Sequence, residues 1–379
     1  DPAIWPTSAD RGTDGLMRIG GVAVTAIVAE AGSPVVVLDR QQLSAAARDY
    51  VAAYAATGAD TTVYYAGKAF LATAVARWLD AEGMGIDVCT QGELEIAVRA
   101  GVPGERILFH GNNKSEAEIA RALEVGVGRF VIDSFAEIAR LGMLAQEAGV
   151  VAQCLVRVTV GVEAHTHEFI ATAHEDQKFG LALADGVAAE AVRRVAALPS
   201  LELRGLHSHI GSQIFDPAGF DVAARRLVGF ATELAQEGIG IEELNLGGGM
   251  GIAYTAADDP LDVGQMAATL VDIVRRECDQ AGLPLPRLSV EPGRAIVGPA
   301  GVTLYTVGTI KTVDLGNGMS RTFVSVDGGM SDNIRTALYD ADYTVVLANR
   351  ASTADAMLCR VVGKHCESGD IVVRDCWLP

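Results

Sequence analysis

The sequence predicts an α/β protein, a (β/α)8 TIM barrel followed by a mostly antiparallel β domain. Between residues 41 and 291 a helix-then-strand unit recurs eight times, and each strand is a short apolar run without alternation. Parallel strands buried on both faces give such runs. Eight repeats close a barrel, whereas an open doubly wound sheet usually has fewer repeats and a glycine-rich turn after its first strand.

Each expected strand follows an amphipathic stretch that we interpret as a helix. The expected helices are 41–56, one starting at Phe70, 92–101, 115–126, 134–149, 186–199, 219–238 and 262–282. The expected barrel strands are 61–66, 85–88, 106–110, 129–133, 151–158, 202–209, 242–246 and 287–291. After Glu291 the pattern changes to β-branched runs separated by turns, which indicates a second domain.

The strand-like runs of this second domain are 302–313, 321–329, 343–349, 357–364 and 370–377. An earlier apolar run, 34–39, precedes all the repeats, and we expect it to join the β domain. We therefore divide the chain into an N-terminal segment 1–40, a barrel 41–291 and a β domain 292–379.

Composition and charge narrow the classes of partner. Of the 379 residues, 50% are hydrophobic and 21% are charged, which is usual for a globular protein. The formal net charge is −18 without a basic cluster, which argues against nucleic acid and anionic membranes. No signal pattern or membrane-spanning apolar stretch is visible, and six scattered cysteines without a C-x-x-C pair favour a reducing cytoplasm.

Polar residues mark the carboxyl ends of the expected barrel strands, where barrels of this kind carry out chemistry. They are Lys68, Asp87, His110, Asp133, Arg157, His209, the glycine run 247–251 and Glu291. Any one of them has a structural explanation; Asp133, for example, could cap the following helix. Their shared position at eight strand ends indicates a functional site.

Lys68 lies in the apolar run 61–70, at what the pattern predicts to be the buried end of a strand. A buried ammonium is costly unless it is paired or deprotonated. Either its stem packs while the amine reaches water, or the amine is neutral and forms an imine with a carbonyl.

Three neighbouring features favour the imine. The run 247–251 lets backbone amides approach a phosphate, and the Ser212 hydroxyl can reach the same group. The His209 ring can stack on a flat ligand, and Glu291 can keep a pyridine nitrogen protonated. Together with Lys68 these features indicate pyridoxal 5′-phosphate (PLP) as the cofactor.

Eight motifs in order carry a resemblance to a known family. They are YYAGKAF, DVCTQGEL, HGNNKS, HSHIGSQIFD, LNLGGGMGIAYT, VEPGRAIVGPAG, VDGGMSDNIRTALY and CESGD. The chain resembles the barrel-type PLP-dependent decarboxylases of alanine-racemase fold and, within them, the actinobacterial form of the diaminopimelate decarboxylase family. The resemblance implies decarboxylation of meso-2,6-diaminopimelate at its D-centre to L-lysine and CO2, the last step of lysine biosynthesis.

The resemblance also implies residue roles. The catalytic residues would be Lys68, His209 and Cys366, the last donating a proton at Cα after CO2 leaves. The cofactor-binding residues would be Lys68, Asp87, His110, Arg157, His209, Ser212, Gly248, Gly249, Glu291, Gly293 and Arg294. The substrate-binding residues would be Arg294, Arg335, Tyr339 and Glu367, with the arginines gripping the distal carboxylate.

An obligate homodimer is implied as well, in which Cys366 and Glu367 reach the active site of the partner subunit. Without the motif, Cys366 would be interpreted as a buried core cysteine, the commoner fate of this residue type. The family continues beyond Pro379 into strands that carry a tyrosine contacting cofactor and substrate, so we expect the β domain to be incomplete. Gly67 stands where the family more often has serine or another small side chain, a change we expect to be tolerated.

Three other interpretations remain at this stage. The protein could decarboxylate ornithine, lysine, arginine or carboxynorspermidine on the same fold, or bind PLP without catalysis. Substrates without a distal carboxylate would not need the arginine in MSDNIRTALY. A metal-dependent hydrolase is suggested by His165, His167 and His174, because H-x-H spacing can ligate zinc. No carboxylate is fixed near them, and we expect no metal.

Overall fold

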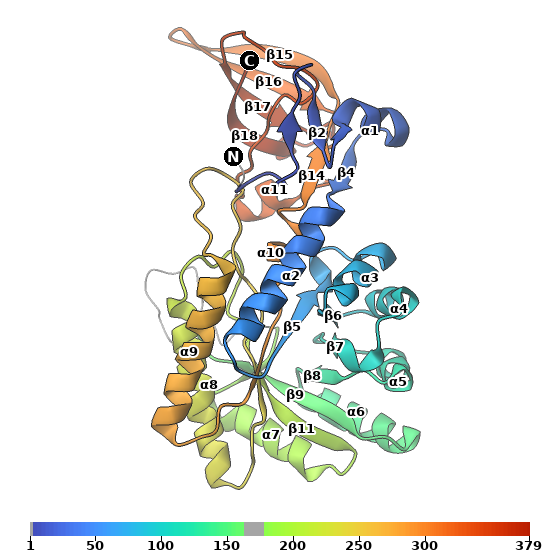
Figure 1. The fold of residues 1–379 in the computed structure, drawn as a ribbon, viewed down its shortest axis with the longest axis vertical. Coiled ribbons are helices and arrows are strands. Elements are labelled where there is room, and N and C mark those ends of the chain that lie inside the picture. The colour runs from blue at the N-terminus through green and yellow to red at the C-terminus, as the bar shows by residue number, and fades with distance from the viewer. Residues whose placement is uncertain (1–2, 163–177) are drawn as a thin grey trace. The chain divides into compact units, whose positions relative to one another are not determined.

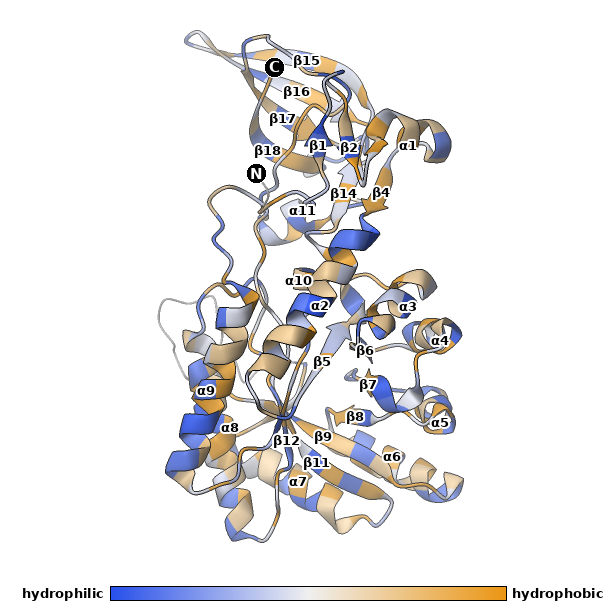
Figure 2. Cartoon of the chain, viewed as in Figure 1, coloured by the Kyte–Doolittle hydropathy of each residue, from blue (hydrophilic) through white to orange (hydrophobic). Residues whose placement is uncertain are grey.

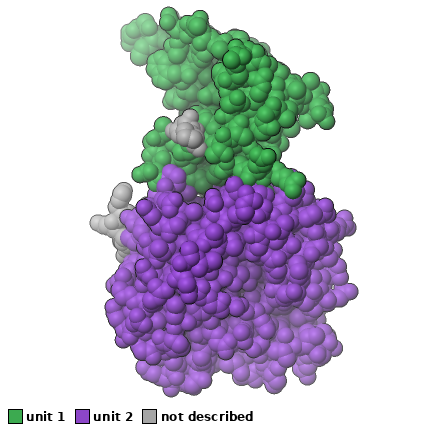
Figure 3. Space-filling view, in the orientation of Figure 1, with its two compact units in different colours: residues 1–43, 252–259, 298–379 green, residues 44–251, 260–297 purple. Residues whose placement is uncertain are grey.

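The computed structural model describes residues 3–162 and 178–379. The chain divides into two compact units, coloured separately in Figure 3. Unit 1 comprises Asp1–Leu43, Ile252–Asp259 and Gly298–Pro379, and unit 2 comprises Ser44–Gly251 and Pro260–Val297. These divisions lie a few residues after the expected boundaries at 40 and 291, and the sequence did not indicate that 252–259 packs with unit 1.

Unit 2 contains a closed barrel of eight parallel strands, which confirms the expected fold class (Figure 1). The strands are β5 (Thr61–Ala66), β6 (Gly85–Val88), β7 (Ile107–Phe109), β8 (Arg129–Ile132), β9 (Ala152–Thr159), β11 (Leu201–His207), β12 (Glu243–Asn245) and β13 (Arg287–Val290). Closure comes from β13, whose Leu288 pairs with Thr61 of β5. The two-residue strand β10 (Leu181–Ala182) adds to β9. All carboxyl ends therefore meet at one mouth of the barrel.

One helix precedes each barrel strand. They are α2 (Arg40–Ala56), α3 (Thr73–Ala81), α4 (Gln91–Ala100), α5 (Glu116–Val125), α6 (Phe135–Ala148), α7 (Val187–Ala197), α8 (Ala218–Gln236) and α9 (Val263–Ala281). Polar and apolar residues alternate along these helices, as expected when one face packs on a barrel (Figure 2). Within 3–162 and 178–379, three short 3-10 helices lie between the longer elements: η1 (Gly67–Ala69), η2 (Gly104–Arg106) and η3 (Ala184–Gly186).

Local sequence signals set several helix ends. A capping box of Ser115 and Glu118 begins α5, and Gly126, at φ 75°, ends it. The Ser134 hydroxyl accepts a hydrogen bond from the Glu137 amide at the start of α6. These caps fix where each helix returns the chain to the next strand.

Unit 1 is a mostly antiparallel β domain, as expected. Its main sheet has the order β15 (Val307–Gly316), β16 (Met319–Val326), β17 (Met357–Val362) and β18 (Ile371–Leu378), with only β16 and β17 parallel. The early strand β4 (Val35–Leu38) pairs antiparallel with β14 (Gly301–Leu304). A small sheet of β1 (Asp10–Arg11), β2 (Met17–Ile19) and β3 (Val22–Ala23) precedes α1 (Val24–Ala31).

The expected strand at 343–349 is wrong, because this segment forms no strand. Two of its residues are used for packing instead: the aromatic Tyr343 and the β-branched Val345 contact a buried cluster that includes Val326 and Val361. Such residues favour burial as much as strand pairing, and here only burial occurs. Among the helices of the described residues, none combines the length and apolarity that a membrane crossing needs.

Candidate active site

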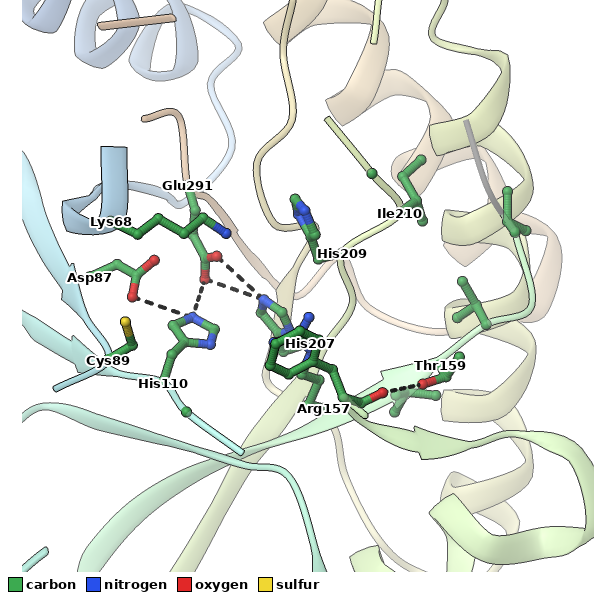
Figure 4. Close-up of a pocket in the computed structure, with 16 residues that line it drawn as sticks. Lys68, Asp87, Cys89, His110, Arg157, Thr159, His207, His209, Ile210 and Glu291 are labelled. Atoms are coloured by element: carbon green, nitrogen blue, oxygen red, sulfur yellow. Dashed lines mark hydrogen bonds and ion pairs between the residues drawn. The ribbon is translucent and has the colours of Figure 1, made fainter. Parts of the chain in front are cut away.

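A cavity of about 340 Å³ lies in unit 2, and its walls come from the carboxyl ends of the barrel strands. This volume is within the range of small-molecule sites. The structure brings together six of the expected site residues in its lining: Lys68, Asp87, His110, Arg157, His209 and Glu291 (Figure 4). The strand-end pattern in the sequence therefore corresponds to one shared space.

Lys68 lies in η1, directly after β5, and its side chain is exposed. The expectation of a buried lysine is wrong, because β5 ends at Ala66 and the chain turns before the lysine. In Figure 4 the amine extends toward the space between Glu291 and His209. The amine is thus placed where a ligand in the cavity can reach it.

Gly67 makes this turn possible. A Cβ at this position would lie 2.6 Å from the carbonyl oxygen of Asp87 and 3.2 Å from Leu71 Cδ2. A separation of 2.6 Å between a Cβ and a backbone oxygen essentially never occurs in proteins, so a side chain here would force the backbone to move. The absence of a side chain therefore lets η1 approach the end of β6.

Glu291 follows β13 and is 6% exposed. Its Oε1 accepts hydrogen bonds from His110 Nε2 and Asn245 Nδ2, both at 2.8 Å, and His207 Nε2 lies 3.4 Å from Oε2. Burial alone would raise the pKa of Glu291, but the facing His110 and His207 imidazoles lower it well below its usual value. A carboxylate offers about four lone-pair positions, so Oε2 can accept from a further donor.

His207 and His209 are two residues apart at the end of β11. Burial lowers the pKa of His207 to about 4. Burial, with the nearby Lys68 and Arg157 cations, lowers the pKa of His209 to about 3. Both rings are neutral at pH 7, so the contact between His207 and Glu291 is a hydrogen bond rather than an ion pair. The Gly248 amide donates to His209 Nδ1 at 3.3 Å, which leaves the proton on Nε2.

Two more ionisable groups line the same wall. Burial raises the pKa of Asp87 to about 7, against the opposing effect of His110, whose Nε2 is 3.8 Å from Asp87 Oδ1. Burial and the Glu93 carboxylate raise the pKa of the Cys89 thiol to about 12, and Cys89 Sγ donates to Glu93 at 3.1 Å. Cys89 is therefore a protonated thiol at pH 7 and not a nucleophile.

Arg157 extends from β9 on another side of the cavity. Its guanidinium carbon lies 4.7 Å from the ring centroid of Phe179. Such a contact between a cation and an aromatic face restricts the orientation of the guanidinium. The cavity thus contains two cationic side chains, Arg157 and Lys68, beside an ionised carboxylate.

The expected glycines support the loops around the cavity rather than line it. A Cβ on Gly248 would collide with the Glu291 carbonyl oxygen, and a Cβ on Gly249, at φ +108°, would collide with that of Gly211. A Cβ on Gly293 would lie 2.9 Å from that of Ala66. These residues allow neighbouring strand ends to touch through their backbones.

Ser212 and Arg294 are also outside the lining but contact each other. Arg294 Nη2, in the short helix α10 (Arg294–Val297), donates to Ser212 Oγ at 3.0 Å. This bond joins the loop after β11 to the segment after β13. The two expected polar groups are therefore neighbours within unit 2.

The expected residues Arg335, Tyr339, Cys366 and Glu367 belong to unit 1. Cys366 and Glu367 are exposed in the loop between β17 and β18. Arg335 begins α11 (Arg335–Tyr339), donates from Nη1 to Tyr343 Oη at 2.8 Å, and lies 5.1 Å from the ring centroid of Tyr254.

No carboxylate of the described residues pairs with Arg335, whose neighbours are aromatic rings, among them that of Tyr339, and a neutral hydroxyl. Tyr339 itself is 67% exposed. A guanidinium without an internal counter-ion remains available to an anionic ligand.

Sequence reasoning missed His207 and Asn245, both fully buried. They lie inside strands rather than after them, so the search of strand ends passed over them. A signal was present, because His207 precedes His209 by two residues and Asn245 precedes Gly247 by two, and residues at this spacing share a face of a strand.

The ligand atoms of His110, His207 and Glu291 lie within 4.8 Å of one another, a donor set that can also hold a metal ion. In the structure these atoms satisfy one another through hydrogen bonds. The alternative metal residues His165, His167 and His174 lie outside the described residues.

Comparisons with known proteins identify the family of the chain. Residues 40–298 match the family model described as pyridoxal-dependent decarboxylase, pyridoxal binding domain. The chain is 53% identical to the diaminopimelate decarboxylase of Mycobacterium tuberculosis over 384 residues, which cover all of this chain and 85% of that relative. It is 54% identical to the Mycobacterium leprae enzyme of the same name over 381 residues, covering 99% of this chain and 80% of the relative.

A similar solved structure is the diaminopimelate decarboxylase of M. jannaschii in complex with L-lysine. It matches with a TM-score of 0.90 and 31% identity, covering 99% of this chain and 85% of the other. The family model covers more than half of the chain, and relatives above 50% identity align over nearly all of it. The chain therefore belongs to the diaminopimelate decarboxylase family of pyridoxal-dependent decarboxylases.

Proposed function

We propose that the protein is a PLP-dependent carboxy-lyase that converts meso-2,6-diaminopimelate to L-lysine and CO2 by removing the carboxylate at the D-centre. The observation that carries this proposal is the cavity in which the Lys68 amine lies beside the ionised, buried carboxylate of Glu291. The M. jannaschii relative with L-lysine bound supports the choice of product.

The side chains of the cavity fit the cofactor. Lys68 would hold PLP covalently, the free lone pair of Glu291 would accept from its ring nitrogen, and the neutral His209 ring offers a flat, uncharged face. Outside the lining, Ser212, which follows the lining residue Gly211, and the glycine run 247–251 would bind the phosphate. When bound, PLP supplies an electron sink for the charge left at Cα after CO2 departs.

The side chains of the protein would have separate roles in the reaction. Glu291 would hold a proton on the ring nitrogen, because His110 and His207 keep its buried carboxylate ionised. Arg335, which has no internal counter-ion among the described residues, would bind the distal carboxylate of the substrate together with Arg294 and Tyr339. Cys366 would donate its thiol proton to Cα, and Glu367 would bind the distal amine.

We further propose a homodimer in which Cys366 and Glu367 serve the active site of the partner subunit. Both are exposed on unit 1, and the cavity lining described above comes from unit 2. We also assign the protein to the cytoplasm, since all six cysteines are free thiols.

The function is tested by spectroscopy and by substrate comparison. Wild-type protein should show a visible absorption band of lysine-bound cofactor, Lys68→Ala should lose it, and the exposed-lysine control Lys311→Ala should keep it. A band that persists in Lys68→Ala would remove Lys68 from its role.

Release of CO2 should occur with meso-diaminopimelate and not with ornithine, lysine or arginine. Comparable turnover of one of these amino acids would favour the alternative decarboxylases. Absence of turnover with every substrate, despite the band, would favour a non-catalytic relative.

A further inference from the structure

We propose that Asp370 is a positioning residue for the reaction, a carboxylate that fixes the loop carrying Cys366 and Glu367. Asp370 joins two loops of unit 1. One is the segment 328–334 before α11, and the other is the segment 363–370 between β17 and β18. The role of Cys366 in this inference rests on the proposed function, whereas the connection between the loops does not.

The carboxylate of Asp370 is only 3% exposed and receives one backbone amide from each loop. Oδ1 accepts from the Met330 amide at 2.6 Å, and Oδ2 accepts from the His365 amide at 2.8 Å. No cation of the described residues forms an ion pair with it. Its carboxylate is therefore bound by two backbone amides, and hydrogen bonds from backbone amides to a carboxylate are among the stronger ones in proteins.

The backbone of Asp370 closes the cysteine loop on itself. Its amide donates to the Glu367 carbonyl at 3.1 Å, and its carbonyl accepts from the Gly363 amide at 2.9 Å. The Lys364 amide donates to the Gly328 carbonyl at 3.0 Å, which adds a second connection between the two loops. The Cys366 backbone therefore lies within a ring of bonds that starts and ends at Asp370.

Two glycines leave room for this carboxylate. A Cβ on Gly329 would lie 2.5 Å from Asp370 Oδ1, and a Cβ on Gly363 would collide with Oδ2. The first is at φ +155°, but the second has no unusual φ, so only the carboxylate accounts for the glycine there. The two loops thus present their bare backbones to one acidic side chain.

The Cys366 side chain depends on this arrangement. Within the described residues its Sγ makes no hydrogen bond and is exposed, so the position of the thiol follows from the loop backbone alone. The other loop that Asp370 binds, 328–334, leads directly into Arg335 at the start of α11. One carboxylate thereby sets both the proposed proton donor and a proposed substrate-binding arginine.

Asp370→Asn is the first test, because the amide keeps the shape but presents a donor to one of the two backbone amides. Hydrogen exchange in the holoenzyme should become faster in peptides covering 328–334 and 363–370 and stay unchanged in the barrel. The value of kcat/KM should fall at least about tenfold, since small misplacements of reacting groups are costly. The visible cofactor band should remain, because Lys68 and Glu291 keep their contacts.

Asp375→Asn is the matched control. This exposed carboxylate is in the same unit and lies 3.8 Å and 3.7 Å from Arg321 and Arg360. Exchange in the two loops and kcat/KM should stay within about twofold of wild type, as expected for surface pairs. Unchanged exchange in both loops of Asp370→Asn would overturn the inference.

A double-mutant cycle keeps the inference testable if Asp370→Asn folds poorly. Gly363→Ala adds a methyl group against Oδ2 and should lower kcat/KM in the wild-type background. In the Asp370→Ala background the same methyl group has space, so its additional effect should be small. Additive effects would contradict the contact.

Cys366→Ala separates this inference from the proposed function. A large loss of turnover supports Cys366 as the donor and, with the exchange result, the full inference. Unchanged turnover in Cys366→Ala would overturn the donor role, while the exchange measured in Asp370→Asn would still decide whether Asp370 joins the loops.

Discussion

At the residue scale, two carboxylates in the same cavity have opposite pKa shifts although both are 6% exposed. Burial raises the pKa of Asp87 to about 7, and His110, whose Nε2 is 3.8 Å away, opposes this shift only in part. The pKa of Glu291 is lowered despite burial, because the His110 and His207 imidazoles face its carboxylate and form hydrogen bonds with it. Both carboxylates are buried, so the two imidazoles that face Glu291 account for the difference between the shifts.

Replacing the charge of Glu291 tests its role. Glu291→Gln keeps the shape but not the negative charge, so the ring nitrogen of the cofactor would no longer hold its proton. We expect kcat to fall at least about a hundredfold, typical of a lost preorganised electrostatic contact. The visible band should remain because Lys68 is unchanged.

Glu242→Gln is the control in the same turnover assay, because Glu242 is an exposed carboxylate that pairs with Arg204. That variant should keep its turnover within about twofold. A Glu291→Gln enzyme with wild-type kcat would exclude Glu291 from the chemistry.

The pH dependence of stability should reveal the neutral His207. Its pKa is about 4 in the fold against about 6.5 in an unfolded chain, so the unfolded state binds more protons between these values. Stability should therefore fall as the pH decreases from 6.5 to 4, by up to roughly 3 kcal/mol from this group. Calorimetric unfolding of cofactor-free protein should show a shallower fall for His207→Gln.

Asp87→Asn should change the slope of stability against pH in the opposite direction to His207→Gln. A carboxyl whose pKa is raised to about 7 makes the fold lose stability as the pH rises from about 4 to 7, and the substitution removes that loss. If both variants change the slope in the same direction, the assignment of charges is wrong.

At the element scale, the alternation of helices and strands could be predicted because strands buried on both faces are apolar throughout. Strand ends were equally visible, since polar residues interrupt those runs, and they led to six residues of the cavity. The segment 343–349 could not be predicted, because burial and pairing select the same residue types. His207 and Asn245 were missed because they lie inside strands, and because their partner, Glu291, is far from both in the sequence.

The short helix η1 can be tested through Gly67. Gly67→Ala would place a methyl group 2.6 Å from the Asp87 carbonyl, so η1 must move and carry Lys68 with it. We expect weaker retention of the cofactor, measured as loss of the visible band on dialysis.

Gly92→Ala is a suitable control in α4, where the nearest atom to the added methyl would be 3.9 Å away. This variant should retain the band and be slightly more stable, since alanine favours helix. Equal cofactor retention in Gly67→Ala and wild type would show that η1 accommodates a side chain.

At the scale of the whole molecule, the expected site residues are divided between the units. The cavity of unit 2 holds the groups proposed for the cofactor, and unit 1 carries Arg335, Tyr339, Cys366 and Glu367. A homodimer that shares residues between subunits makes this division testable, because two defective subunits can then compensate for each other.

Mixing Lys68→Ala and Cys366→Ala subunits should restore activity. Half of the redistributed dimers would be mixed, and each would have one complete site, so about a quarter of wild-type turnover should return. Sizing chromatography before and after mixing gives the oligomeric state. If activity does not return although mixed dimers form, Cys366 acts within its own subunit.

The discontinuous make-up of unit 1 has a consequence for how the protein is made. A ribosome completes every stretch of unit 2 once residue 297 has been added, whereas β4 waits for β14, about 260 residues later in translation. Until β14 is made, the apolar segment Val35–Leu38 lacks its pairing strand. We therefore expect chaperones that bind nascent chains to bind this segment.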